Sequence, residues 1–373
     1  MEIAMIFTSG TILLCALALT NKFSKRQITL ISLLFLVIVA VIYKPDSGMD
    51  LYRHYQMLDL FAKYGLENTI MTNMDRMGTL PLYALFFYFI SLFHYNQLLL
   101  AFTYIVVYSA QFKVLSMYVN DNGYDKKSWM IGYSLIMLTT NAYGLTGIRN
   151  FLAFAITEVF LYIDLCRREH RKLSMVIYFS MCLLHDSIIL ILAFRLMVYV
   201  IEKFRTVSQN VILFLILVSP IMIKGMGTFL RTTPISFLKA VGNKILTYGG
   251  TDGINSYGGD AGTEIRATMG LIILMLVVFC IKATLNKEYY QRSDIKMLVI
   301  ITLFCFGGMI GNRVLVERYI TMGVMFAIPT MVKVIREGCP QSGYYIKTNA
   351  IPLITMVCIL FSNICYWQYR FFI

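Results

Sequence analysis

The sequence predicts an all-α polytopic membrane protein, with about 12–13 transmembrane helices in one domain that covers residues 1–373. Apolar residues make up 58% of the chain and charged residues only 14%, whereas a soluble domain carries about a quarter charged residues. Apolar windows of about 17–22 residues, long enough to cross a hydrocarbon core, recur from end to end. Runs such as Leu271–Cys280 do not alternate every second residue, as strands of a transmembrane β-barrel would.

The first half of the chain alternates apolar runs with short basic loops. The expected helices are 3–20, 28–43, 97–119, 129–142, 149–165, 173–184 and 187–201. Residues 44–78 are polar and partly amphipathic, which predicts an outer loop with a helix lying on the membrane surface. Pro81–Phe93 is apolar but too short to span, which favours a re-entrant or surface helix. If this segment does span, Asp50 moves to the opposite membrane face from Arg149.

The second half contains the longest polar segment of the chain, residues 224–266. The expected helices here are 210–223, 267–283, 296–312, 319–333 and 348–366. The later part of 224–266 is rich in glycine and predicts a long outer loop. Its Gly-Gly and Gly-Asp pairs neither follow a strand nor open a helix, so we do not expect a nucleotide-binding loop.

The net charge of +13 reflects basic residues that collect in short cytoplasmic loops, so we do not expect nucleic-acid binding. The loops assigned to the cytoplasmic side by alternation are 21–27, 120–128, 166–172, 202–205, 282–296 and 333–347. The eight cysteines lie mostly inside apolar runs without metal-ligand spacing, and there are only four histidines. We therefore expect neither a metal nor another cofactor.

Two arginines open predicted membrane helices on the outer face, Arg149 in GLTGIRNFLAFA and Arg318 in GNRVLVERYITM. A guanidinium group fits phosphate oxygens two at a time, and a helix start adds free backbone N–H groups. These features favour an anion clamp, to which Arg266 contributes a third cation. The alternatives are an interfacial arginine at Arg149, and, near Arg318, a structural pair of Arg313 with Glu317 four residues later.

Two further groups of polar residues belong to the same predicted face. His185, in LLHDSIIL, is a natural proton acceptor for a sugar hydroxyl, or a satisfied structural group. The stretch GMDLYRHY predicts sugar recognition, or an ion pair within the loop. Its candidate residues are Asp50, Tyr52, Arg53 and His54. No HExxH motif, Gly-x-Ser-x-Gly motif or phosphate-loop lysine is present, which disfavours zinc-protease, serine-nucleophile and nucleotide chemistry.

These motifs, in this order, resemble those of the EpsG family, part of the broader Wzy-type polysaccharide polymerases. The family patterns G-x-D-x-x-x-Y, I-R-Q-x-[IL]-A and H-x-S are matched at Gly48, Asp50, Arg149 and His185 to Ser187. The chain departs from them where Tyr55 is shifted by one position, or replaced by Tyr52, and where Asn150 stands in place of glutamine.

The resemblance implies a C-type glycosyltransferase-like bundle with outward-facing loops, in the bacterial cytoplasmic (inner) membrane. It implies a metal-independent polymerase that joins undecaprenyl-pyrophosphate-linked oligosaccharide repeat units into O-antigen, capsule or exopolysaccharide, with a lipid pyrophosphate as leaving group. Donor and acceptor are both lipid-linked, and a chain-length regulator and a flippase are the expected partners.

The residue roles that fit this chemistry follow from charge and acidity. Arg149, with Arg318 and Arg266, holds the donor pyrophosphate, whose departure develops negative charge. His185 accepts the proton of the attacking hydroxyl, or Asp50 does so. Tyr52, Arg53 and His54 bind the acceptor sugar.

Two other classes remain open on the sequence. A flippase or exporter of lipid-linked sugar would carry charges near the membrane midplane and an internal repeat, whereas here most charges lie at helix ends and no repeat is visible. A membrane acyltransferase that modifies the polysaccharide would also use a histidine as base.

Overall fold

The computed structural model describes most of the chain as helices. The described residues are 2–20, 22–47, 49–74, 80–140, 147–203, 207–234, 239, 242–243, 246, 261–284, 287–311 and 313–337. Among these residues there is no strand. Three helices are long and apolar enough to cross a membrane, Lys25–Ile42, Gln97–Asp121 and Arg318–Arg336. The pair Asn210–Ile223 and Gly225–Arg231, bent by 43°, forms a fourth candidate if it is one span. The described part of the chain is thus all-helical and has the composition of a helical membrane protein.

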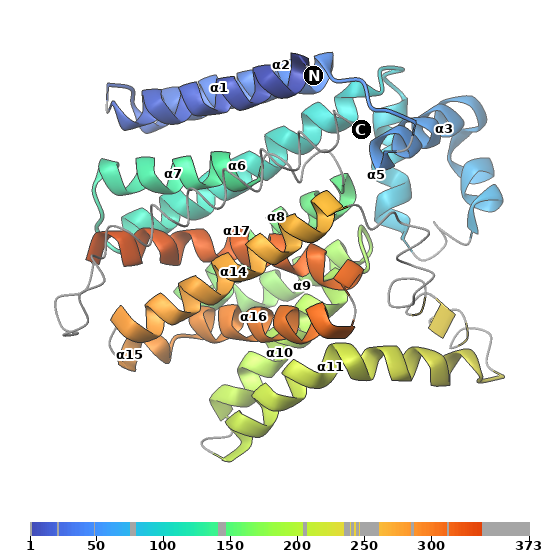
Figure 1. Ribbon diagram of the computed structural model, residues 1–373. Coiled ribbons are helices and arrows are strands. Elements are labelled where there is room, and N and C mark those ends of the chain that lie inside the picture. Colours follow the sequence, from blue (N-terminus) through green and yellow to red (C-terminus); the bar gives the residue numbers. More distant parts are fainter. Residues whose placement is uncertain are drawn as a thin grey trace. The chain divides into compact units, whose positions relative to one another are not determined.

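The chain divides into two compact units, Met1–Leu192 and Ala193–Ile373. The first unit is built around α6, the long helix that packs mainly against α2, α7 and α8 and also contacts α5 (Figure 1). Its helices are α1 (Glu2–Leu19), α2 (Lys25–Ile42), α3 (Asp50–Thr72), α5 (Pro81–Ser91), α6 (Gln97–Asp121), α7 (Lys126–Thr140), α8 (Ile148–Leu161), the π-helix η1 (Tyr162–Arg167), α9 (Arg171–Cys182) and the start of α10 (Ile188–Lys203). Helices α2, α7 and α8 contact α6, and α3 packs on α5.

In the first unit, α2 contacts a buried aromatic group on one face and exposes aliphatic side chains on the other. Phe112, Trp129 and Tyr133 form a packed aromatic group between α6 and α7, with ring centroids 5.4–6.1 Å apart. On α2, Ser32 is fully buried and its hydroxyl bonds that of Tyr133. The same helix exposes Leu30, Ile31, Leu34, Ile38, Val41 and Ile42. An apolar outer face of this extent is typical of contact with lipid rather than with water.

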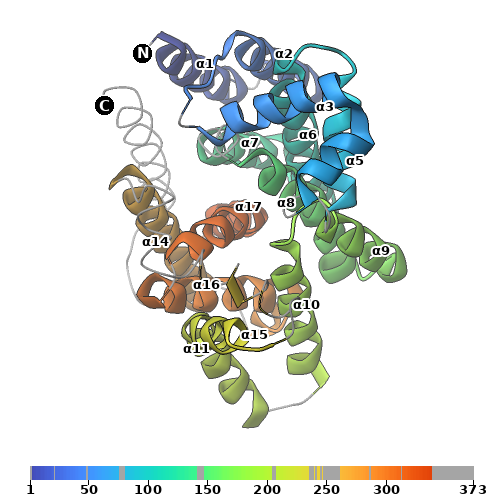
Figure 2. The same cartoon turned by 90° about the vertical axis from the view of Figure 1, so that its right-hand side faces the viewer.

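The second unit packs its helices around α16 (Figure 2). Its elements after α10 are α11 (Val207–Arg231), α14 (Ala261–Thr284), α15 (Lys287–Tyr290), α16 (Ser293–Gly311) and α17 (Arg313–Glu337). Helices α11, α14 and α17 all contact α16. The buried rings of Phe194, Phe304 and Tyr319 meet edge to face, with centroids 5.0–5.9 Å apart, and join α10, α16 and α17.

Predicted and observed helices differ most at the ends of the segment 224–266. Helix α11 continues to Arg231 and α14 begins at Ala261, so both ends of the predicted loop are helical. The hydroxyls of Thr232 and Thr233 donate to the carbonyl oxygens of Phe229 and Leu230 and close α11 later than its apolar pattern indicates. The predicted helix 348–366 and residues 247–260 of the loop lie outside the described residues.

The region before α6 contains two of the predicted helices. The loop 44–78 does contain a helix, α3, which Gly65 interrupts with a backbone φ of 76°. Helix α5 has 11 residues. At 1.5 Å per residue it is about 16 Å long, roughly half of a hydrocarbon core. A helix of that length does not cross the membrane alone.

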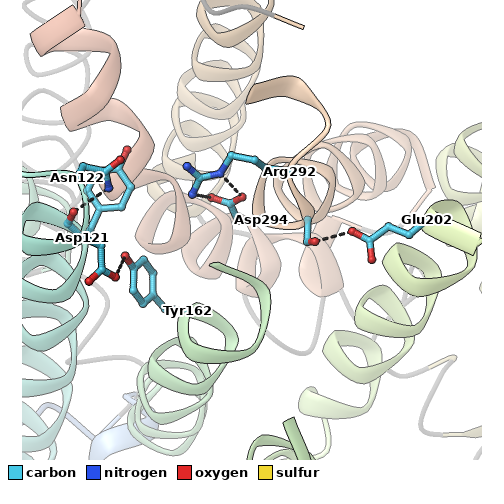
Figure 3. Close-up of polar contacts among 8 residues, drawn as sticks. Asp121, Asn122, Tyr162, Glu202, Arg292 and Asp294 are labelled. Atoms are coloured by element: carbon cyan, nitrogen blue, oxygen red, sulfur yellow. Dashed lines mark hydrogen bonds and ion pairs between the residues drawn. The ribbon is translucent and has the colours of Figure 1, made fainter. Parts of the chain in front are cut away.

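Loops that the sequence assigns to one membrane side contact each other within each unit (Figure 3). In the first unit, the Asp121 carboxylate accepts hydrogen bonds from the Tyr162 hydroxyl at 2.8 Å and from Arg167. In the second unit, the Ser293 hydroxyl donates to Glu202. These contacts join 120–128 to 166–172, and 202–205 to 282–296.

Candidate functional site

The site begins at the first turn of α8, where Arg149 lies. Gly147 precedes the helix, and its carbonyl oxygen accepts from the backbone N–H of Phe151 at 2.8 Å. Because glycine has no side chain to cap the helix, the positive end of the helix dipole is left uncapped by this residue. The Arg149 guanidinium lies over the Tyr83 ring of α5, 4.3 Å from its centroid. This cation–π contact holds the guanidinium at the helix start.

Helix α5 connects Arg149 to His54 and to the turn that carries His185. The Tyr83 ring meets that of Phe87 at 4.4 Å between centroids, and Phe87 meets the His54 ring of α3 at 5.3 Å. The backbone N–H of Tyr83 donates to the carbonyl oxygen of Leu183 at 3.3 Å, just before the turn that carries His185. One short helix therefore touches α3, the start of α8 and the turn between α9 and α10.

His54 lies within electrostatic reach of Arg149. Burial, followed by the positive charges of Arg149 and Arg53, lowers the pKa of His54 from 6.5 to about 3. The imidazole is therefore neutral at physiological pH. It can donate one hydrogen bond and accept another, as recognition of a sugar hydroxyl requires.

His185 forms a buried hydrogen-bonded group with its neighbours and with α8. Its Nδ1 lies 2.7 Å from the Ser187 hydroxyl oxygen, 3.1 Å from the backbone nitrogen of Ser187 and 3.4 Å from a carboxylate oxygen of Asp186. The Ser187 hydroxyl donates to the amide oxygen of Asn150 at 2.7 Å. Since Asn150 follows Arg149 in the first turn of α8, the histidine turn and the arginine belong to one cluster.

Asp50 and Arg53 occupy more exposed positions than His54, Arg149 and His185. The carboxylate of Asp50 pairs with Arg53 one turn later, at 3.4 Å, and both side chains are about half exposed, at 48% and 51%. The ion pair within the loop, which the sequence left open, is therefore present. Tyr52 is also exposed, and Gly48 lies outside the described residues.

Arg266 and Arg318 belong to the second unit, whereas the other candidates belong to the first. Arg266 lies in α14, and its side chain is outside the described residues. The prediction that Arg318 opens its helix is wrong, because α17 already begins at Arg313. No glycine or proline separates the two arginines, so nothing in this stretch prevents the helix from starting earlier.

The sequence did not indicate three participants in this cluster. Tyr83 and Phe87 lie in a short apolar run that indicated only a helix, and Asn150 is 37 positions from its partner Ser187.

Among the described residues, no group of three or more His, Cys, Asp and Glu side chains is arranged to hold a metal ion. Comparisons of the chain with protein-family models, with curated proteins and with solved structures found no match in any of the three.

Proposed function

We propose that the chain is a bacterial inner-membrane polymerase that joins undecaprenyl-pyrophosphate-linked oligosaccharide repeat units at the outer membrane face, in a C-type glycosyltransferase-like bundle. The observation that carries the proposal is the meeting of three separate motifs in the first unit. His54, Arg149 and the turn at His185 are joined through Tyr83, Phe87 and Asn150. The residues to which we assign phosphate binding, hydroxyl binding and proton acceptance thus belong to one cluster, which supports the proposal.

Arg149 is the donor pyrophosphate clamp in this proposal. No described carboxylate forms an ion pair with it, so its charge is available to an anion. The ring of Tyr83 lies against the face of the guanidinium, and a guanidinium donates its hydrogen bonds in its plane. A fixed cation at a helix start stabilises the negative charge that develops on a departing pyrophosphate. Arg318 and Arg266 remain predicted contributors to the same role.

His185 is the general base of the transfer step. The acceptor hydroxyl oxygen attacks the anomeric carbon of the donor sugar, and its proton passes to the imidazole. The bond from the anomeric carbon to the pyrophosphate oxygen breaks, and its electron pair leaves with the lipid pyrophosphate. Neutral His54, with Arg53 and Tyr52, binds hydroxyls of the acceptor, and Asp50 accepts from them; Asp50 is the alternative base.

The test uses purified protein in lipid nanodiscs with lipid-linked repeat units as the only substrate. Longer lipid-linked chains should form without nucleotide sugar, acyl donor or ion gradient, which separates polymerisation from acylation and transport. His185→Asn should lower the rate by about 100-fold or more, the range of general base catalysis.

His170→Asn is the matched control. It removes a histidine from a predicted cytoplasmic loop, at a backbone φ of 45° that asparagine tolerates. This variant should polymerise at the wild-type rate. Absence of any chain extension by the folded wild-type protein would exclude the proposed function.

A further inference from the structure

The connection between η1 and α9 presents basic side chains on the surface of the first unit. Only Arg168, Glu169 and His170 separate the two helices, and the first and last of these have left-handed backbone φ values of 60° and 45°. The backbone N–H of Glu169 donates to the carbonyl oxygen of Ile163 at 3.1 Å, and that of Ser174 donates to His170 at 2.9 Å. The turn is therefore short and hydrogen-bonded to the helices on both sides.

The cations of this turn outnumber the acids that pair with them. Arg171 approaches the buried carboxylate of Asp164 at 3.8 Å, but its own side chain stays 57% exposed. Arg168 and Lys172 are exposed, and neither forms an ion pair with a carboxylate of the described residues. Glu169 is the only acidic residue of the turn. This end of α9 therefore carries positive charge that is available to an anion from outside the unit.

One of these cations continues an apolar stripe along α9. The stripe repeats at intervals of four, three and four residues, which places its members on one face of a helix. Its members are Lys172, Val176, Phe179 and Leu183. The three apolar side chains are 60%, 63% and 46% exposed. The opposite face of α9 carries the buried residues Ser174, Tyr178 and Met181, and α9 packs against α8. The exposed face thus joins a charged end to an apolar length.

We propose that the turn 168–172 and the exposed face of α9 bind an anionic phospholipid. The lipid phosphate pairs with Arg168 and Lys172, and an acyl chain lies along Val176 and Phe179. A soluble anion would leave the apolar stripe without an occupant, and an apolar protein helix would leave the cations without one. The turn lies at the other end of α8 and η1 from Arg149, so this site is separate from the proposed pyrophosphate clamp.

The test uses the full-length protein in nanodiscs of phosphatidylcholine with a minor share of phosphatidylglycerol that has the same acyl chains. Native mass spectrometry after release from the discs measures which lipid stays bound. The wild-type protein should retain phosphatidylglycerol in preference. The double variant Arg168→Asn with Lys172→Gln should lower this preference by about tenfold or more, because each basic side chain contributes to headgroup attraction. Asparagine is chosen at position 168 because it tolerates a left-handed backbone.

The matched control is Lys44→Gln with Lys63→Gln, which removes the same charge from exposed positions outside this turn. Its lipid preference should equal that of the wild type. The variant Arg168→Lys with Lys172→Arg, which conserves the charge, should also keep the preference and shows that the turn tolerates substitution. Phe179→Ala should lower retention of both lipids, since it shortens the apolar contact.

Four results would overturn the proposal. They are equal retention of the two lipids by the wild type, an unaltered preference in the double variant, an equal loss in the control, and complete displacement of the lipid by inorganic phosphate. Melting temperatures in nanodiscs give an independent measurement. Phosphatidylglycerol should stabilise the wild type and not the double variant. An equal loss of melting temperature in the double variant with and without phosphatidylglycerol would assign the surface to a protein contact instead.

Discussion

Arg149 and Arg167 lie at opposite ends of one continuous helical segment, α8 and η1, in opposite electrostatic surroundings. Arg167 donates two hydrogen bonds of 2.7 Å to the two carboxylate oxygens of Asp121, which also accepts from Tyr162. Arg149 has an aromatic ring against its face, a neutral histidine nearby, and no described carboxylate as an ion-pair partner. A paired arginine stabilises the fold, whereas one held in place without a counter-ion is suited to bind an anion.

The largest expected effect comes from Arg149, which has no ion-pair partner among the described residues. Arg149→Ala should lower kcat for polymerisation by about 100-fold or more, the typical cost of removing one fixed donor to a developing negative charge. Single repeat units should accumulate. Arg149→Lys should recover only part of the activity, because an ammonium lacks the planar fork. Wild-type chain lengths from a folded Arg149→Ala protein would contradict the clamp.

The paired arginine should show the opposite pattern. Arg167→Ala leaves the Asp121 carboxylate without its bidentate partner and should destabilise the protein by about 1–2 kcal/mol, since both side chains remain about one third exposed. The melting temperature in nanodiscs should fall, while the activity per folded molecule stays near the wild type. A selective loss of kcat without a change in melting temperature would show that the two ends do not differ as described.

The pKa of His54 reports the excess positive charge at the Arg149 end. Removal of that charge in Arg149→Gln should raise this pKa from about 3 towards 6.5, although burial, the larger cause, will keep it below that value. Addition of inorganic pyrophosphate to the wild-type protein should shift it in the same direction. NMR titration of labelled histidine measures both shifts, and a pKa unchanged in Arg149→Gln would contradict the proximity of the two groups.

The lowered pKa of His54 also predicts the sign of a pH effect on stability. Between pH 6.5 and about 3 the unfolded chain binds this proton more readily than the folded chain. Acidification through that window therefore lowers the free energy of unfolding. Above pH 6.5, where His54 is neutral in both states, this loss of stability is absent. Replacement of His54 by glutamine should flatten this part of the stability curve.

The smallest expected effect belongs to the ion pair of Asp50 and Arg53. Both side chains are about half exposed, so Asp50→Asn should change the unfolding free energy by less than about 1 kcal/mol. If Asp50 contacts the acceptor, KM for the acceptor will rise without a matching loss of kcat. A fall in kcat as large as that of His185→Asn would instead identify Asp50 as the base.

Local patterns predicted the helices of this protein well and the contacts between them less well. The apolar runs gave most helix positions to within a few residues, and the short length of Pro81–Phe93 predicted that α5 cannot span alone. The i, i+3 spacing of Asp50 and Arg53 likewise predicted their pair.

Contacts between distant segments carry no comparable signal in one sequence. Asn150 and Ser187 meet because α8 and the turn after α9 pack together, and Tyr83 lies over Arg149 because α5 folds back onto the same turn. At Arg318 the sequence pattern was misleading. Its similarity to the pattern around Arg149 predicted a helix start at Arg318, whereas α17 begins five residues earlier, at Arg313.

The wide turn of η1 has a consequence for how this chain tolerates insertions and deletions. Each residue of an α-helix advances its azimuth by about 100°, so one residue added within Ile148–Leu161 would swing Arg149 away from Tyr83 if Arg167 stayed on Asp121. A π turn can close into an α turn and take up one deleted residue. The six residues Tyr162–Arg167 are therefore where the helix can change length and keep the rotational phase of its first turn.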